Sequence, residues 1–276
     1  MSAARPRLAA PPGACDTHMH FYDRNVPAAP GGPPLPGHFD VAAYRQVQRR
    51  LNLQRVIVVQ PNAYQFDNRV TLAAIAELGN SARGVAVVDE SVGDAELERM
   101  TRAGIRAQRI FELPFGAVGL ARMDAIMARV HPFGWHANVQ LDGRTLPQVE
   151  AQLLRLPGKF VIDHNGKFLE PVGTDAPSFK ALLRLVDSGR CWVKLSAPYE
   201  TSRSGAPSYE DVGRIAKALV AHAPERMLWA SNWPHPSAKD APPDDAALLD
   251  LLLDWAPNEA DRHRILADNP AELYGF

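Results

Sequence analysis

Three polar residues alternate in the segment ACDTHMH near the N-terminus. Asp16, His18 and His20 are each separated by one residue, so an extended chain projects their side chains to the same side. Two imidazoles at this spacing form half of a metal site, and histidine is also the usual proton carrier near neutral pH. Two core histidines held by hydrogen bonds are the alternative. Because polar groups on a buried face need compensation, we favour catalysis or metal binding.

A second polar cluster follows an apolar run in VIDHNGKF. His164 comes just after the run, and Lys167 lies three residues further on. An imidazole at the carboxyl end of a strand is placed to act as a proton carrier or a ligand. A lysine beside it can bind a substrate carboxylate. We therefore predict that His164 is catalytic and that Lys167 binds substrate.

A third apolar run ends in MLWASNWPHPS, where Asn232 and His235 follow Ser231. A pocket for acid–base chemistry favours a carboxylate at the position of Asn232. An amide cannot take a proton from water near pH 7, but it offers one acceptor and two N–H donors. It is suited to hold a carbonyl, an oxyanion or a hydroxyl. We predict that Asn232 serves a reaction that needs no water and that His235 binds substrate.

Further polar residues lie in or after other apolar runs. Each is individually compatible with a solvated or structural role, but together they gather where a barrel builds its active site. We predict substrate binding for Asn62, Asn68, Arg109, Gln140, Lys194 and Arg203. The sequence has no nucleophile elbow, phosphate loop or Cys-x-x-Cys pair, so serine-triad and nucleotide chemistry lack support.

The elements that must position these residues are short apolar runs alternating with amphipathic segments. The runs are rich in Val and Ile with little alternation, as strands covered on both faces are. We predict strands at 14–18, 55–60, 84–88, 105–110, 136–141, 160–164, 192–196 and 227–231. Helical patterns occupy 95–104, 145–156 (with Thr145 as cap), 208–223, 244–256, 258–268 and 269–276.

Eight strands, each followed by a helix, predict an α/β fold of the (β/α)₈ TIM barrel type. A doubly wound open sheet is the alternative, and the lack of a glycine-rich loop after the first strand weakens it. We predict an N-terminal tail at 1–13 and a single barrel domain at 14–276. The proline- and glycine-rich segment 26–40 is either a surface linker or a stiff loop over the barrel mouth.

Composition and charge argue against two classes of partner, nucleic acids and membranes. The chain has 276 residues, 46% of them hydrophobic, and a formal net charge of −1, so nothing points to nucleic acid or an anionic membrane. No apolar stretch is long enough to span a bilayer, and the N-terminus lacks the apolar core of a signal peptide. We expect a cytoplasmic protein in which Cys15 and Cys191 are buried free thiols. Nothing in the composition indicates an oligomeric state.

The motifs together resemble a known family. DTHMH, QPNAYQFDN, VIDHNGK and WASNWPHP are similar to the lactonase-like branch of the amidohydrolase superfamily, which includes 2-pyrone-4,6-dicarboxylate lactonases. The resemblance runs from about Cys15 to the C-terminus and implies an amidohydrolase-like barrel. Most such amidohydrolases carry Asp at the position of Asn232. The segments 222–235, 112–120 and PAAPGG also resemble the sugar-acid lactone isomerases of this branch.

This resemblance implies a lactone isomerase of galactarate and galacturonate catabolism. Such an isomerase would convert D-galactaro-1,5-lactone to the 1,4-lactone by intramolecular acyl transfer. Because Asn232 is neutral and removes an anionic ligand from the site, we predict that the enzyme needs no metal or other cofactor. The expected catalytic residues are His18, His20, His164 and Asn232, with His164 or His20 as the proton shuttle. Because His18 completes a possible ligand set, a lactone hydrolase with Zn bound by His18, His20 and His164 is an alternative. A barrel that only binds a sugar acid is another.

Overall fold

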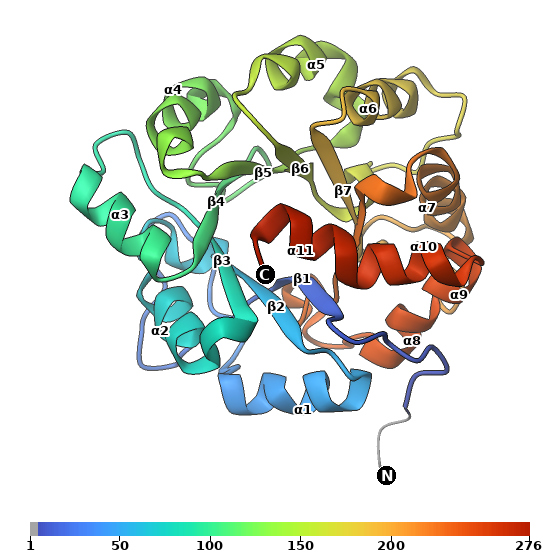
Figure 1. The fold of residues 1–276 in the computed structure, drawn as a ribbon, viewed down its shortest axis with the longest axis horizontal. Coiled ribbons are helices and arrows are strands. Elements are labelled where there is room, and N and C mark those ends of the chain that lie inside the picture. The colour runs from blue at the N-terminus through green and yellow to red at the C-terminus, as the bar shows by residue number, and fades with distance from the viewer. Residues whose placement is uncertain (1–4) are drawn as a thin grey trace.

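Eight short strands run parallel to one another in chain order in the computed structural model, which describes residues 5–276 (Figure 1). Seven parallel pairings join consecutive strands. This order confirms the (β/α)₈ barrel and excludes the doubly wound sheet. The strands are β1 (Cys15–Met19), β2 (Arg55–Val59), β3 (Ala82–Ala86), β4 (Ile105–Phe111), β5 (His136–Gln140), β6 (Phe160–Ile162), β7 (Cys191–Leu195) and β8 (Met227–Trp229).

The seam between β1 and β8 is closed by residues that flank the expected site. The backbone N–H of Asn232 donates to the His18 carbonyl over 2.9 Å, and that of His20 donates to the Trp233 carbonyl over 2.8 Å. Asp16 accepts hydrogen bonds from the backbone N–H and the hydroxyl of Ser231. The Asp16 carboxylate, one of the three alternating polar residues, is therefore used in closing the barrel.

Helices surround the barrel, and the longer ones bury an apolar stripe, the pattern expected of amphipathic helices. In α6, for example, Phe179, Leu182, Leu185 and Val186 are buried. The helices between strands are α1 (Val41–Leu51), α2 (Arg69–Leu78), α3 (Asp94–Arg102), α4 (Leu120–Val130), α5 (Leu146–Arg155), α6 (Pro177–Asp187) and α7 (Glu210–His222). After β8 come α8 (Asp245–Asp250), α9 (Leu252–Trp255), α10 (Glu259–His263) and α11 (Asn269–Tyr274).

The helix α11 lies across one end of the barrel (Figure 1). Its Leu273 and Tyr274 pack against inward-facing strand residues, which include Ile57, Val161 and Trp192. This end is therefore filled by apolar side chains, and the functional groups gather at the other end. Of the predicted tail, Leu8 and Ala10 are buried in the main core, while residues 1–4 lie outside the described residues.

Several predicted boundaries differ from the structure. β3 begins and ends two residues before the predicted 84–88, and β6 and β8 each end two residues early. The predicted helix 244–256 is divided into α8 and α9, and 258–268 ends in a π-helical turn. Thr145 precedes α5 without capping it, because its hydroxyl donates back to the Asp142 carbonyl.

The two cysteines and the lengths of the helices can be compared with the predictions. Cys15 and Cys191 are both buried and free, which confirms the prediction. Within residues 5–276, every helix is too short or too polar to cross a membrane.

Candidate active site

A cavity of about 730 Å³ opens at the carboxyl ends of the strands. Residues on or following β1, β2, β4, β5, β6, β7 and β8 line it, as expected for a TIM barrel site. Those that offer polar groups are His20, Tyr22, Asn62, Arg109, Gln140, His164, Lys167, Tyr199, Glu200, Asn232, Ser237 and Lys239. Seven of the residues predicted from sequence are among them: His20, Asn62, Arg109, Gln140, His164, Lys167 and Asn232.

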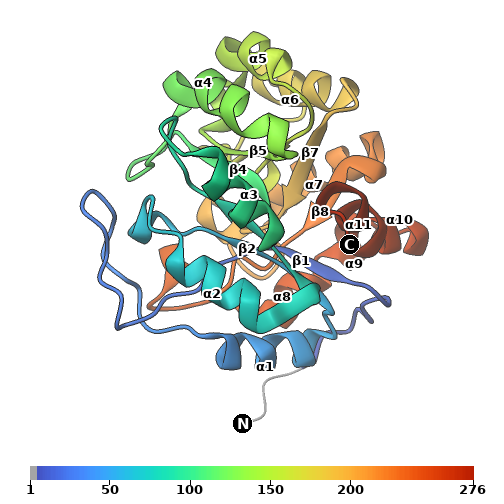
Figure 2. The same cartoon turned by 60° about the vertical axis from the view of Figure 1, so that its left-hand side comes forward.

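The segment 26–40 forms part of the cavity wall. Residues 33–36 line it, and the backbone N–H of Ala29 donates to the Ala63 carbonyl in the loop after β2. Figure 2 shows this blue segment as a long excursion between β1 and α1. The structure thus supports the interpretation as a stiff loop at the barrel mouth over that of a surface linker.

His18 and His20 form a hydrogen-bonded chain with Lys194. His20 Nδ1 lies 2.8 Å from the Val59 carbonyl oxygen, which can only accept, so Nδ1 bears the proton. His20 Nε2 then accepts from His18 Nε2 at 3.2 Å. His18 Nδ1 in turn accepts from the Lys194 ammonium at 3.1 Å. The arrangement uses every ring nitrogen of both histidines.

His164 follows β6 in the left-handed region, with φ of 54°. Its Nδ1 lies 2.8 Å from the Ser196 hydroxyl, and no described residue bonds its Nε2, which is left for a ligand in the cavity. Burial lowers the pKa of His164 to about 4, against the opposing effect of Glu200. The imidazole is therefore neutral near pH 7, and its unprotonated ring nitrogen can accept a hydrogen bond from a hydroxyl group.

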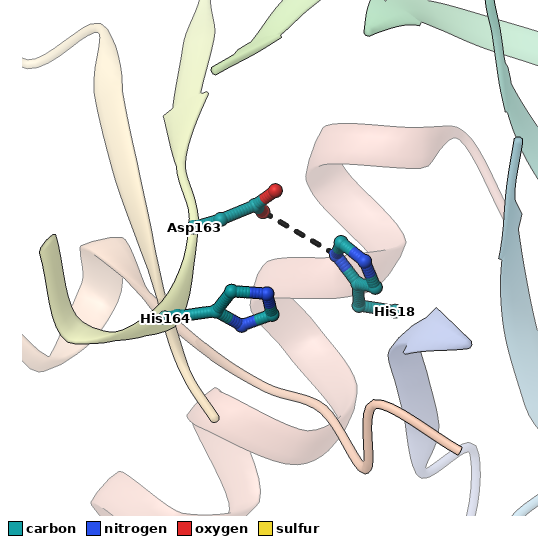
Figure 3. Close-up of side chains that lie close together, drawn as sticks. All are labelled: His18, Asp163 and His164. Atoms are coloured by element: carbon teal, nitrogen blue, oxygen red, sulfur yellow. Dashed lines mark ion pairs between the residues drawn. The ribbon is translucent and has the colours of Figure 1, made fainter. Parts of the chain in front are cut away.

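His18, Asp163 and His164 place one ligand atom each within 4.8 Å of one another. Figure 3 shows the three side chains pointing toward one another, and Asp163 Oδ1 lies 3.4 Å from His18 Nδ1. Such donors can bind a divalent ion. However, the Lys194 ammonium already lies 3.1 Å from both Asp163 Oδ1 and His18 Nδ1 and 2.6 Å from Asn138 Oδ1. A cationic side chain thus lies against two of the three candidate ligands and competes with a metal ion for them.

The alternative zinc set of His18, His20 and His164 meets the same obstacle. To bind zinc through Nε2, His18 needs its proton on Nδ1. The nitrogen that bears that proton lies 3.1 Å from the Lys194 ammonium, which is itself a donor, and its nearest acceptor, Asp163 Oδ1 at 3.4 Å, already pairs with Lys194. Although burial raises the pKa of Asp163, Lys194 and His18 hold it well below its usual range. The buried charges are already balanced, and the residues do not fit a resident metal ion.

Asn232 has a fixed amide orientation. Its Nδ2 donates to the Tyr199 hydroxyl over 2.9 Å and to Glu200 Oε1 over 3.3 Å. A carboxylate can only accept, so the amide nitrogen must be the atom that faces it. Both N–H groups are therefore used, and Oδ1 is the atom that remains to accept a hydrogen bond from a substrate hydroxyl.

Arg109 is the buried cation that has no carboxylate partner among the described residues. It is 4% exposed, its Nη1 donates to the Gln60 carbonyl over 2.6 Å, and it stacks over the Phe111 ring. Lys167, by contrast, pairs with Glu200. An unpaired guanidinium in a cavity wall is suited to bind a carboxylate through two parallel hydrogen bonds.

Five predicted site residues lie outside the cavity lining. Arg203 is exposed and paired with Glu170, and the Asn68 side chain bonds backbone groups of Phe66 and Val87. The structure therefore does not bring these two side chains to the cavity. His18 and Lys194 are buried behind His20.

His235 also lies behind the wall, between Tyr199 at 3.0 Å and Asp245 at 3.0 Å. It positions the Tyr199 hydroxyl rather than binding substrate itself.

Five polar cavity residues were not among the predicted site residues: Tyr22, Tyr199, Glu200, Ser237 and Lys239. Tyr199 and Glu200 follow β7 in SAPYE, at the carboxyl end of a strand, the kind of position that produced the other predictions. Asp163, which pairs with Lys194 below the cavity, was also absent from the predicted set. Its position directly before His164, at the end of the same apolar run, is the signal that could have identified it.

The buried imidazoles make stability depend on pH. Burial lowers the pKa of His20 and His136 from 6.5 to about 3 and that of His164 to about 4. The unfolded chain thus binds these protons more readily, so stability is full above pH 6.5 and falls as pH drops toward 4. We expect the free energy of unfolding to decrease by about 1 kcal/mol per imidazole between pH 7 and 5.5.

Asp16 offsets part of this loss, because burial raises its pKa to about 6 and the folded chain then takes up that proton. Urea unfolding at several pH values measures the net effect. A free energy of unfolding that stays constant from pH 7.5 to 5 would contradict the expectation.

Comparisons with known proteins agree with this geometry. The model of the family described as Amidohydrolase matches residues 15–276. The chain is 43% identical to D-galactarolactone isomerase of Agrobacterium fabrum, over 99% of this chain and 95% of that one. It is 32% identical to the 2-pyrone-4,6-dicarboxylate hydrolase of Comamonas testosteroni, over 98% and 93%. An apo crystal structure from Agrobacterium tumefaciens superposes with a TM-score of 0.93 at 43% identity, covering 98% of each chain.

Proposed function

Because this chain belongs to the amidohydrolase family, we propose that it is an enzyme that converts D-galactaro-1,5-lactone to D-galactaro-1,4-lactone. The similarity to a D-galactarolactone isomerase extends over nearly the whole chain and exceeds the similarity to the lactone hydrolases. The free thiols of Cys15 and Cys191 support a cytoplasmic location.

Asn232 is the observation that favours isomerisation over hydrolysis. At the end of β8 an amide stands where a carboxylate would activate water, and its N–H groups are already bound. The nearby carboxylate, Glu200, is a poor base. Despite its burial, Lys167 and His164 lower its pKa to about 2. The cavity therefore lacks a carboxylate with the basicity to remove a proton from water.

The rearrangement itself needs no water. The C4 hydroxyl of the substrate attacks the C1 carbonyl, a tetrahedral oxyanion forms, and the bond from C1 to the C5 oxygen breaks. Attack within one molecule benefits from proximity that is built into the substrate. One proton moves from the C4 oxygen to the C5 oxygen, and nothing else is gained or lost.

The described residues can serve each step. Neutral His164 accepts the C4 proton at Nε2 and returns it to the C5 oxygen. Asn232 Oδ1 accepts a hydrogen bond that orients a hydroxyl. Arg109 binds the free carboxylate, and the Lys167 ammonium has N–H bonds beyond the one to Glu200 that can stabilise the oxyanion.

NMR of the purified protein with D-galactaro-1,5-lactone tests the proposal. We expect resonances of the 1,4-lactone to appear faster than in buffer alone. Formation of galactarate instead would identify a hydrolase. No change relative to buffer would indicate a barrel that binds without catalysis.

We also propose that the reaction needs no metal, because Lys194 provides the positive charge between His18 and Asp163. Exhaustive chelation should leave turnover unchanged within about twofold, and elemental analysis should find less than one equivalent of zinc. Activity that disappears on chelation and returns with one equivalent of Zn²⁺ would refute this proposal.

A further inference from the structure

Glu200 places a carboxylate in the wall of a cavity that is expected to bind an anion. It ends the short 3₁₀ turn after β7 (Pro198–Glu200), and its side chain is 10% exposed. Three groups from other loops hold it: the ammonium of Lys167, the Asn232 amide at 3.3 Å and the Ser237 hydroxyl at 2.5 Å. The carboxylate is thus fixed in place, ionised and directed at the cavity.

The charges around the cavity leave one buried cation for a ligand. Lys167 is neutralised by Glu200, and Lys194 below the cavity by Asp163. His20 and His164 are neutral, since burial lowers their pKa values to about 3 and 4.

The remaining lining cations are Arg109 and Lys239. Lys239 lies at the rim with its side chain 52% exposed and is paired with Asp240. Arg109 has no carboxylate partner among the described residues. The interior therefore matches a ligand with a single negative charge.

We propose that Glu200 restricts the site to polyhydroxylated lactones with one carboxylate. This rests on the proposed function and names its substrate class. The carboxylate occupies Lys167, which would otherwise bind a second carboxylate, and it repels an anion in a cavity of low polarity.

Glu200 has a favourable role as well. An ionised carboxylate only accepts hydrogen bonds, and its oxygens have lone pairs beyond those used by Lys167, Asn232 and Ser237. Hydroxyl groups of a sugar lactone can donate to them, whereas a planar ring that bears only carboxylates cannot. Repulsion of one ligand class and attraction of the other then act through the same two oxygen atoms.

Calorimetric titration with benzoate and benzene-1,3-dicarboxylate tests the inference. The two probes share a ring and differ by one carboxylate. In Glu200→Gln, which keeps the side-chain shape, Lys167 becomes free to bind the second carboxylate. We expect affinity for the dicarboxylate to rise by about 10- to 100-fold over wild type, while affinity for benzoate changes by less than about threefold. Glu200→Ala, should the Gln variant not fold, is expected to behave in the same way.

Two variants serve as controls. Asp240→Asn makes the same charge change and frees Lys239. Because this pair is exposed at the rim, solvent screens its charges, and both affinities should stay unchanged. Adding Lys167→Met to Glu200→Gln should abolish the gain. No gain in dicarboxylate affinity in the Glu200 variants, or an equal gain in Asp240→Asn, would overturn the proposal. The titrations need no turnover, so they are decided independently of the NMR assay on the wild-type protein.

Discussion

Replacing His164 with Asn should lower turnover by about 10²- to 10⁴-fold, the usual contribution of a general acid–base group. The imidazole is neutral, its Nδ1 is held by Ser196, and its Nε2 faces the cavity without a described partner. Asn can still hydrogen-bond the substrate but cannot take up a proton near neutral pH. Steady-state rates followed by NMR or a coupled lactone assay measure the loss.

His222→Asn is the matched control for this change. His222 ends α7, where it pairs with Asp187 outside the cavity, so the same substitution there should leave turnover unchanged. A His164→Asn variant that folds and retains near-native turnover would show that His164 does not carry the proton.

Replacing Arg109 with Met should lower kcat/KM by about 30- to 4,000-fold. This range corresponds to the 2–5 kcal/mol that removal of one partner from a buried charge pair costs. The guanidinium is the buried cation left unpaired within residues 5–276, so the substrate carboxylate has no equivalent partner. Arg109→Lys keeps the charge but not the bidentate geometry, so its kcat/KM should lie between those of the wild type and Arg109→Met.

Lys239→Met is the control for Arg109. It removes another lining cation, but one that is half exposed and paired with Asp240, and kcat/KM should change by less than about threefold. If both variants lost activity equally, the carboxylate would be bound by the general field of the cavity rather than by Arg109. Because the Gln60 carbonyl loses its hydrogen bond from Arg109 in the Arg109 variants, thermal unfolding is needed to check that the variant proteins still fold.

The strands could be predicted from sequence because barrel strands are covered on both faces and are written as continuous apolar runs. Their ends were less certain. After β6 and β8 the chain turns into left-handed conformations at His164 and Asn232, and residues that read as strand ends belong to the turns. A pattern of residue types contains no direct signal for positive φ at residues other than glycine.

Gln140, His164 and Asn232, which end a strand or follow one within three residues, line the cavity, and their roles remain predictions. Arg203 and Asn68 lie several residues into loops, where distance along the chain does not determine position in space. The role of Glu200 depends on Lys167, from another loop, and neither residue alone indicates that their charges cancel. Likewise, the contact of Lys194 with Asp163 depends on the pairing of β7 with β6, which neither residue alone indicates.

The closure of the barrel has a consequence for how the protein is made. Asp16 accepts hydrogen bonds from Ser231, which is 215 residues later in the chain, and His18 and His20 complete their backbone bonds with the loop after β8. During synthesis, the polar groups of β1 therefore cannot form these hydrogen bonds until nearly the whole polypeptide has been made. Because contacts between residues so far apart in sequence form late in folding, we expect the seam between β1 and β8 to close only after residues 231–233 have been synthesised. A chain truncated before residue 231 lacks these partners of Asp16, His18 and His20 and should leave the seam open.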